Sequence, residues 1–342
     1  MDKWNNKRVL ITGVCGTVGS ELLTQVRGLQ VSEIIGIDNN ESELFFQEET
    51  CRGDERVNLY LGDVRDRDKL TRKMRHIDIV LHAAALKHVI LCERSPRDAV
   101  QTNIIGVQNV IDAAIANDVE RVIFTSSDKA VNPTNVMGTT KLMGERLMTA
   151  ANAVQRSGGT MFASTRFGNI LGSRGSVIPL FKKQIKEGGP VTLTDPLMTR
   201  FIMTTAQAAW LVLDSVFLAR GGEVFVTKMP VVRIKDLARV MVAELAPKYG
   251  HDPKDVEIYI TGAKPGEKLY EVLLSEEETR RAVELDNYFS VLPAFKSVYG
   301  DITFNYPGVM GEGKVVKAYN SLMERAMSAE DLKIFLIDNK LI

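Results

Sequence analysis

The stretch RVLITGVCGTVGSELLTQVRGLQVSEIIGID, residues 8–38, decides the fold. It begins with the apolar run 8–13 and ends with the apolar run 33–38, and a helical pattern lies between them. Both runs are nearly continuous rather than alternating, which is typical of parallel strands covered on both faces. The same alternation of apolar runs and helical patterns continues through the runs 57–63, 78–84, 121–127 and 161–170. It predicts an α/β fold with a doubly wound parallel sheet.

Three glycines, Gly13, Gly16 and Gly19, stand between the first run and the first helical pattern. Glycines in this strand–turn–helix context let the backbone approach a pyrophosphate, whose charge is met by the helix N-terminus. The turn therefore predicts a Rossmann-type dinucleotide site, which includes Thr17 and Val18 at the start of the helix. A glycine-rich turn without a ligand is the alternative, and the strand–turn–helix context disfavours it.

Asp38 ends the second run, where an acidic side chain accepts hydrogen bonds from ribose hydroxyls and repels a 2′-phosphate. No Arg or Lys follows within IDNNESELFF, residues 37–46, so NAD is favoured over NADP. Asp38 has a second interpretation as the N-cap of the next helix, a position that Asn39 or Asn40 also suits. The other expected cofactor contacts lie at the ends of the third and fourth runs: Asp63, Val64, Ala83 and Ala84.

The rhythm changes after about residue 170, where Gly and Pro become frequent and short strands alternate with helices of mixed length. The expected short strands are 191–195, 223–228 and 257–262. We expect residues 1–170 to form the Rossmann domain, with contributions from later segments, and residues 171–342 to form mainly a smaller C-terminal α/β lobe that binds substrate.

Composition excludes several classes of protein. The 342 residues include 43 Lys and Arg and 43 Asp and Glu, without blocks of like charge, which argues against nucleic acid as the main partner. Three widely spaced cysteines and four histidines without ligand spacing predict neither a disulfide framework nor a metal site. A polar N-terminus and the absence of a long apolar run predict a cytoplasmic protein without a membrane span.

Chemically capable side chains gather after the fifth run, which ends in Ser127, Asp128 and Lys129. Ligands of doubly wound sheets sit beyond the carboxyl ends of the strands, so these residues are placed beside the nicotinamide. Lys141 follows on the next helix, and Met137 stands four residues before it. A helix cap with an exposed lysine is the alternative interpretation of Asp128 and Lys129.

Short-chain dehydrogenases/reductases usually carry Tyr-x-x-x-Lys on this helix, and here Met137 takes the place of the Tyr. The segment SSDKAVNPTNVMGTTKLMGE, residues 126–145, resembles the UDP-N-acetylglucosamine 4,6-dehydratases of polysaccharide biosynthesis, some of which have Met there. Five further segments resemble the same family in order and spacing: HAAALKHV (82–89), TNIIGVQNVI (102–111), TRFGNILGSRGSVIPLF (165–181), TDPLMTRFIMT (194–204) and KPGEKLYEVLLSEEE (264–278). On these motifs the chain is identified as a member of that branch.

The resemblance implies C4 oxidation of a hexose, loss of water across C5 and C6, and return of the hydride to C6. Lys129 would be the C5 base if it is neutral, a state that burial and a nearby cation such as Lys141 favour. Asp128 would protonate the departing hydroxyl, Ser127 would bond to the C4 oxygen, and Lys141 would hold the nicotinamide ribose. The C4 hydroxyl proton has three candidate acceptors: Asp128, Lys141, or a water held by Thr125 or Ser127.

The resemblance also implies substrate contacts. Lys87 follows the fourth strand, Asn169 would bond to the sugar or diphosphate, and Glu267 would accept from a ribose hydroxyl. Three cations are candidate diphosphate ligands: Arg174, Arg200 and Lys264. In this family an Asn at the place of Asn103 helps to arrange the active-site helices.

Two other functions compete with the dehydratase. A nucleotide-sugar 4-epimerase shares the C4 oxidation but generally relies on the missing Tyr, and a non-catalytic dinucleotide-sensing protein would keep the fold without turnover. The expected substrate is a UDP-HexNAc, and the sequence leaves the nucleotide base and the C5 stereochemistry open. The helical patterns 99–118 and 135–154 are apolar around much of their circumference, which predicts a homodimer.

Overall fold

The computed structural model describes residues 2–154, 159–173, 175–262, 267–295 and 302–342. The chain divides into two compact units. Unit 1 consists of Met1–Phe167, Ala208–Thr227 and Leu274–Ala318, and unit 2 consists of Gly168–Gln207, Lys228–Leu273 and Tyr319–Ile342. The first boundary therefore falls close to residue 170, and two later stretches return to unit 1.

A single large sheet organises unit 1. In spatial order its strands are β16 (Val309–Lys314), β14 (Ala282–Leu285), β15 (Tyr288–Val291), β10 (Val224–Thr227), β6 (Met161–Phe167), β5 (Arg121–Ser127), β4 (Ile79–His82), β1 (Arg8–Thr12), β2 (Glu33–Asp38) and β3 (Val57–Leu61). From β10 to β3 the strands run parallel, and β15, β14 and β16 extend the sheet antiparallel. The predicted doubly wound sheet is confirmed, with its topological switch point between β1 and β4.

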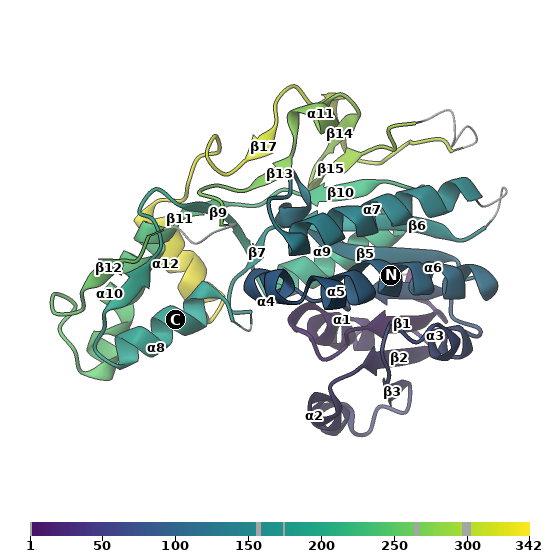
Figure 1. Ribbon diagram of the computed structural model, residues 1–342, viewed down its shortest axis with the longest axis horizontal. Helices are drawn as coiled ribbons and strands as arrows, with labels where there is room; N and C mark the ends of the chain where they lie inside the picture. Colours follow the sequence, from purple (N-terminus) through teal and green to yellow (C-terminus); the bar gives the residue numbers. More distant parts are fainter. Residues whose placement is uncertain (1, 155–158, 174, 263–266, 296–301) are drawn as a thin grey trace. The chain divides into compact units, whose positions relative to one another are not determined.

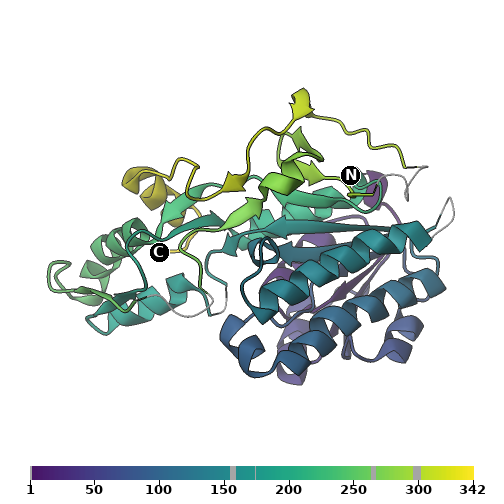
Figure 2. The ribbon, with the colours of Figure 1, turned by 45° about the horizontal axis from the view of Figure 1, so that its top comes forward.

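Helices accompany this sheet, and the longer ones, such as α1 and α6, bury apolar residues. The helices are α1 (Thr17–Arg27), α2 (Glu41–Cys51), α3 (Arg67–Lys73), α4 (Val89–Arg94), α5 (Pro96–Val100), α6 (Gly106–Ala116), α7 (Val136–Val154), α9 (Thr205–Leu218) and α11 (Glu276–Thr279). Helices α6 and α7 lie side by side across one face of the strands (Figures 1 and 2). There Val110 of α6 and Met148 of α7 pack in one buried cluster with Leu10, Val122 and Phe162 of the strands.

Three expected elements differ from the structure. The helix expected over 99–118 is interrupted by a π-helical segment, Gln101–Ile105, between α5 and α6. The strand expected over 161–170 divides at Gly168 into β6 of the large sheet and β7 (Asn169–Ile170) of unit 2. The strand expected over 223–228 is β10 of the large sheet rather than part of the smaller lobe. The hydrophobic pattern of the sequence identifies a buried strand, but it does not determine to which sheet the strand belongs.

Unit 2 is built from short elements around its own core. Its strands are β7, β8 (Val191–Leu193), β9 (Thr199–Met203), β11 (Val231–Arg233), β12 (Ile258–Ile260), β13 (Val272–Leu274) and β17 (Tyr319–Asn320), and its helices are α8 (Val177–Lys186), α10 (Ile234–Leu245) and α12 (Ala329–Asp338). Phe181, Met241 and Leu336 of the three helices pack together in the core. Within the described ranges, no helix is both long enough and apolar enough to cross a membrane.

Candidate active site

The glycine turn after β1 is closed tightly. Gly13 has φ 69°, and a Cβ on it would lie 2.7 Å from the backbone of Ala84, so only glycine fits there. A Cβ on Gly19 would overlap the carbonyl oxygen of Gly13. Gly16 is the N-cap of α1 and supplies no capping side chain, which leaves the first N–H groups of α1 open to an anion. This arrangement fits the pyrophosphate of a dinucleotide.

Acidic side chains follow β2 and β3 beside this turn. Asp38 accepts hydrogen bonds from the backbone N–H groups of Cys15 (2.9 Å) and Asn40 (3.0 Å), so it also supports the glycine turn. Asp63 is paired with Arg65, whose guanidinium approaches to 2.6 Å, and this hydrogen bonding holds the pKa of Asp63 at about 2. Arg65 therefore shares the carboxylate that the sequence predicts as a cofactor contact, and the Val64 side chain is buried in the core beside it.

Asp128 and Lys129 form a compact pair at the carboxyl end of β5. They stand in a short 3-10 turn, Asp128–Ala130, directly after Ser127. Lys129 Nζ donates to Asp128 Oδ1 at 3.1 Å, and Ser127 Oγ donates to the same oxygen at 2.6 Å. Asp128 is fully buried, and its other oxygen, Oδ2, has no hydrogen-bond partner among the described residues. A buried, unpartnered carboxylate oxygen is costly, so it marks a place for a substrate group or a proton.

Lys141 reaches the same strand end from α7. Its Nζ donates to the carbonyl oxygen of Thr125 at 2.9 Å and lies 4.6 Å from the centre of the Phe124 ring. Burial lowers the pKa of Lys141 to about 8, and Glu145 acts in the opposite direction. His82 on β4 is also buried, and burial together with Lys141 lowers its pKa to about 3, so His82 is neutral.

Met137 is a packing residue at the start of α7. Its side chain is buried in a small apolar cluster with Cys92 of α4 and Ala99 of α5. The thioether therefore joins three helices instead of supplying a proton-transfer group. In this respect the structure gives Met137 a different role from that of the Tyr it replaces.

Asn103, in the π-helical segment, ties the loop after β4 to α7. Its amide bonds to both backbone groups of Leu86, at 2.8 Å and 2.9 Å, and donates to Thr140 Oγ1 at 3.0 Å. The loop fixed in this way carries the exposed Lys87. A π-turn inside a helix frequently occurs at a functional site, and here it points the Asn103 amide at both partners.

The substrate contacts expected in unit 2 have local partners. Asn169 donates to the carbonyl oxygen of Phe201 at 3.3 Å. The Arg200 guanidinium is buried and donates to the carbonyl oxygens of Lys268 (2.8 Å), Leu269 (3.2 Å) and Thr199 (2.8 Å), and it lies 3.8 Å from Glu267. In this structure Arg200 anchors the segment that carries Glu267. Arg174 and Lys264 lie outside the described residues.

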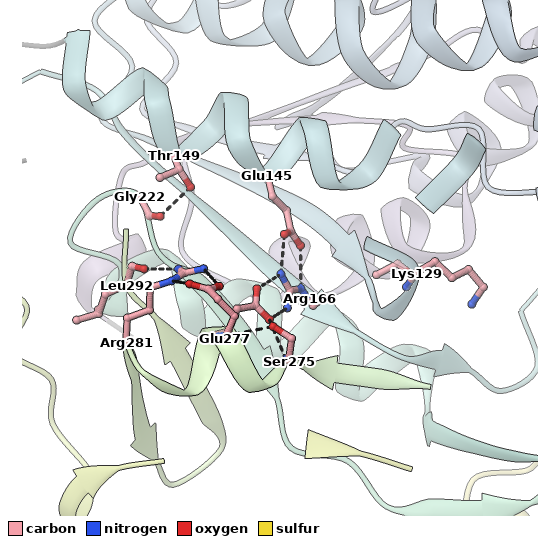
Figure 3. Close-up of polar contacts among 11 residues, drawn as sticks. Lys129, Glu145, Thr149, Arg166, Gly222, Ser275, Glu277, Arg281 and Leu292 are labelled. Carbon is pink, nitrogen blue, oxygen red and sulfur yellow. Dashed lines mark hydrogen bonds and ion pairs between the residues drawn. The ribbon is translucent and has the colours of Figure 1, made fainter. Parts of the chain in front are cut away.

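The sequence analysis did not predict a buried ion cluster that lies near Lys141. Arg166 of β6 forms ion pairs with Glu145 of α7 and with Glu278 of α11. Figure 3 shows the contact between Arg166 and Glu145. Arg166 is next to Phe167, where the first stretch of unit 1 ends, and Glu278 closely follows the return of the chain to unit 1 at Leu274. The available signal was an arginine inside the apolar run 161–170, because a cation there needs a buried counter-charge.

Comparisons with known proteins agree with this geometry. The model of the family described as "Polysaccharide biosynthesis protein" matches residues 9–293. The UDP-N-acetylglucosamine 4,6-dehydratase (inverting) of Campylobacter jejuni is 38% identical over 317 residues, which cover 92% of this chain and 91% of the relative. A UDP-glucose 4-epimerase of Rickettsia felis is 36% identical over 342 residues, which cover 97% and 96%.

Solved structures show the same architecture. The X-ray structure of Pen from Bacillus thuringiensis has a TM-score of 0.90 at 40% identity, and the likeness covers 99% of both chains. DesIV from Streptomyces venezuelae, a dTDP-glucose 4,6-dehydratase solved with NAD bound, shares the fold at a TM-score of 0.66 and 23% identity, over 77% and 86% of the two chains. The chain belongs to the polysaccharide-biosynthesis family of short-chain dehydrogenase/reductase enzymes, whose named relatives are nucleotide-sugar dehydratases and epimerases.

Proposed function

We propose that the protein is an NAD-dependent 4,6-dehydratase that converts UDP-N-acetylglucosamine to a UDP-4-keto-6-deoxy-HexNAc. The observation that carries the proposal is the Asp128–Lys129 pair at the end of β5, with Asp128 Oδ2 buried and without a hydrogen-bond partner among the described residues. An elimination across C5 and C6 needs one base and one acid close together, and this pair supplies both. The sequence of the Campylobacter jejuni dehydratase supports the same reaction.

The residues at the switch point fit NAD. The pyrophosphate would lie on the turn from Gly13 to Gly19 and on the first N–H groups of α1, at Thr17 and Val18. Asp38 would accept from the adenosine ribose with its remaining lone pairs, and Lys141 would hold the nicotinamide ribose. When bound, NAD supplies the acceptor for the C4 hydride and the source of the hydride that is returned to C6.

Asp128 and Lys129 can exchange one proton without changing the net charge of the pair. Transfer from the Lys129 ammonium along its hydrogen bond to Asp128 Oδ1 leaves a neutral amine and a protonated carboxyl. The amine then takes the C5 proton, and the carboxyl gives its proton to the departing C6 hydroxyl, which leaves as water. Both groups are then in the charged forms in which they began. When hydride returns to C6, the Lys129 ammonium would give a proton to C5, and the proton released from the C4 hydroxyl would restore that ammonium.

One experiment separates the candidate functions. The protein is incubated with UDP-N-acetylglucosamine and NAD in deuterated water, and the product is examined by NMR. A 4,6-dehydratase is expected to give a 4-keto-6-deoxy sugar that carries deuterium at C5, and the signals report the C5 configuration. Conversion to UDP-N-acetylgalactosamine without deuterium would show a 4-epimerase instead. An unchanged sugar together with NAD binding would show a dinucleotide-sensing protein.

A homodimer is also proposed, through the face that carries α4, α5 and α7. Several large apolar side chains on these helices and on the π-helical segment are exposed to solvent: Ile90, Leu91, Val100, Ile105 and Met143. Large exposed apolar side chains on neighbouring elements are typical of an interface. Light scattering at micromolar concentration is expected to give a dimer mass, and Leu91→Lys should shift it toward the monomer. A monomer mass for the unaltered protein would contradict the proposal.

A further inference from the structure

The cluster around Arg166 carries a net negative charge. Arg166 donates to both oxygens of Glu145, at 2.9 Å and 2.7 Å, and to both oxygens of Glu278, at 2.9 Å and 3.1 Å. All three side chains are buried: 1% of the Arg166 side chain, 3% of Glu145 and 7% of Glu278 is exposed. One guanidinium and two carboxylates sum to one negative charge, which needs a cation in the same interior.

Lys141 is that cation. It lies on α7 one turn before Glu145, on the same side of the helix at the i, i+4 spacing. Its ammonium contacts the Thr125 carbonyl oxygen and the Phe124 ring, and within the described ranges no carboxylate forms an ion pair with it. The positive charge of Lys141 and the surplus negative charge of the cluster therefore balance at longer range, within one buried region.

Other charged groups near Lys141 leave this balance unchanged. Neutral His82 on β4 contributes no charge. Asp128 and Lys129, after β5, form an ion pair whose net charge is zero. Glu93 of α4 is engaged at the start of α7, where it accepts from the Val136 N–H at 2.6 Å.

We infer that Glu145 and Glu278, joined by Arg166, act as positioning residues that keep Lys141 in its cationic form. This inference depends on the proposed function only for the use that the enzyme makes of Lys141, which is to hold the nicotinamide ribose. Burial alone drives a lysine toward the neutral amine, and a nearby surplus carboxylate opposes that tendency. The second carboxylate is essential, because a single Glu paired with Arg166 would leave no surplus charge.

Two glutamine variants remove the surplus charge without leaving an ion unpaired. Glu278→Gln leaves Arg166 paired with Glu145, and Glu145→Gln leaves it paired with Glu278. Glu278 also completes a capping box with Ser275, and Gln supports such a box as well, so α11 keeps its start. The matched control is Glu277→Gln on the same helix, because the Glu277 side chain is 64% exposed and its ion pair is with Arg281, outside the cluster.

The direct measurement is an NMR titration of Lys141 in protein with isotope-labelled lysine, with the signal assigned by comparison with Lys141→Arg. The midpoint is expected to fall by about one pH unit in Glu145→Gln, because the buried Glu145 carboxylate, one helical turn from Lys141, favours the charged amine. It should fall by a smaller amount in Glu278→Gln and stay unchanged in Glu277→Gln. Thermal melting of each variant is measured first.

Each outcome of these measurements supports or overturns the inference. An unchanged midpoint in folded Glu278→Gln or Glu145→Gln overturns the inference, as does a Lys141 that is already neutral at pH 7 in the unaltered protein, whether or not the variants fold. Calorimetry of NAD binding at low and high pH, beside Lys141→Met, tests the use of the charge. If the midpoint shifts but NAD affinity does not follow it, the counter-charge role stands and the proposed contact of Lys141 with the cofactor fails.

Discussion

Lys129→Ala is expected to lower the rate of 4-keto-6-deoxy sugar formation by about 10²–10⁴-fold, the usual contribution of a positioned acid–base group. Lys129 contacts Asp128 Oδ1 directly, so its removal takes away both the C5 base and the proton donor to Asp128. NAD binding should survive, because the glycine turn after β1 holds the other end of the cofactor. Product formation is followed by NMR and NAD binding by calorimetry.

Met137 provides the contrast to Lys129. Its thioether is buried against Cys92 and Ala99 and cannot carry a proton, so Met137→Leu should leave turnover nearly unchanged. A volume-conserving apolar exchange usually costs less than about 1.5 kcal/mol of stability. Met137→Ala should lose more stability than activity, since truncation of a buried Met leaves a cavity. If Lys129→Ala kept near-native dehydration, or if a folded Met137 variant lost dehydration, Lys129 would not be the base. Lys141 would then be the next candidate for the base.

Gly19→Ala is expected to weaken NAD binding by about ten- to hundredfold. The added Cβ would overlap the Gly13 carbonyl oxygen and force the turn open. Overpacking of this kind typically costs ~1–3 kcal/mol, and each ~1.4 kcal/mol is a tenfold change in affinity. Thr24→Ala, at an exposed position on α1, is the control that should bind NAD normally.

Asp38→Ala should act differently from Gly19→Ala at the same site. Loss of the carboxylate removes the repulsion of a 2′-phosphate, so the preference for NAD over NADP should fall. Loss of the hydrogen bond from the Cys15 N–H should weaken the binding of both dinucleotides alike. Calorimetry with both dinucleotides measures the two effects. Tighter binding of NADP than of NAD by the unaltered protein would refute the assignment of Asp38, and undiminished NAD binding by Gly19→Ala would refute that of the turn.

Local chemistry explains what the sequence predicted. The glycine turn depends on backbone geometry within a few residues, and so Gly13, Gly16 and Gly19 could be recognised from spacing alone. The parallel strands were visible because strands buried on both faces are apolar throughout. Asp128 and Lys129 are adjacent in the chain, and the rule that ligands bind at the carboxyl ends of strands placed them without any knowledge of packing.

Long-range packing decided the features of the site that the sequence did not predict. Arg166 and Glu278 are 112 residues apart, and no periodicity joins a strand of the first half to a one-turn helix of the second. The sequence predicts Arg200 as an anion ligand, but in the folded chain its guanidinium donates to the carbonyl oxygens of Lys268 and Leu269. Met137 becomes a packing residue only because α4 and α5 close over it. The sequence fixes the chemical type of a side chain. Its burial and its counter-charges exist only after distant segments of the chain meet. At Lys141, burial and counter-charge together decide whether the amine carries a charge.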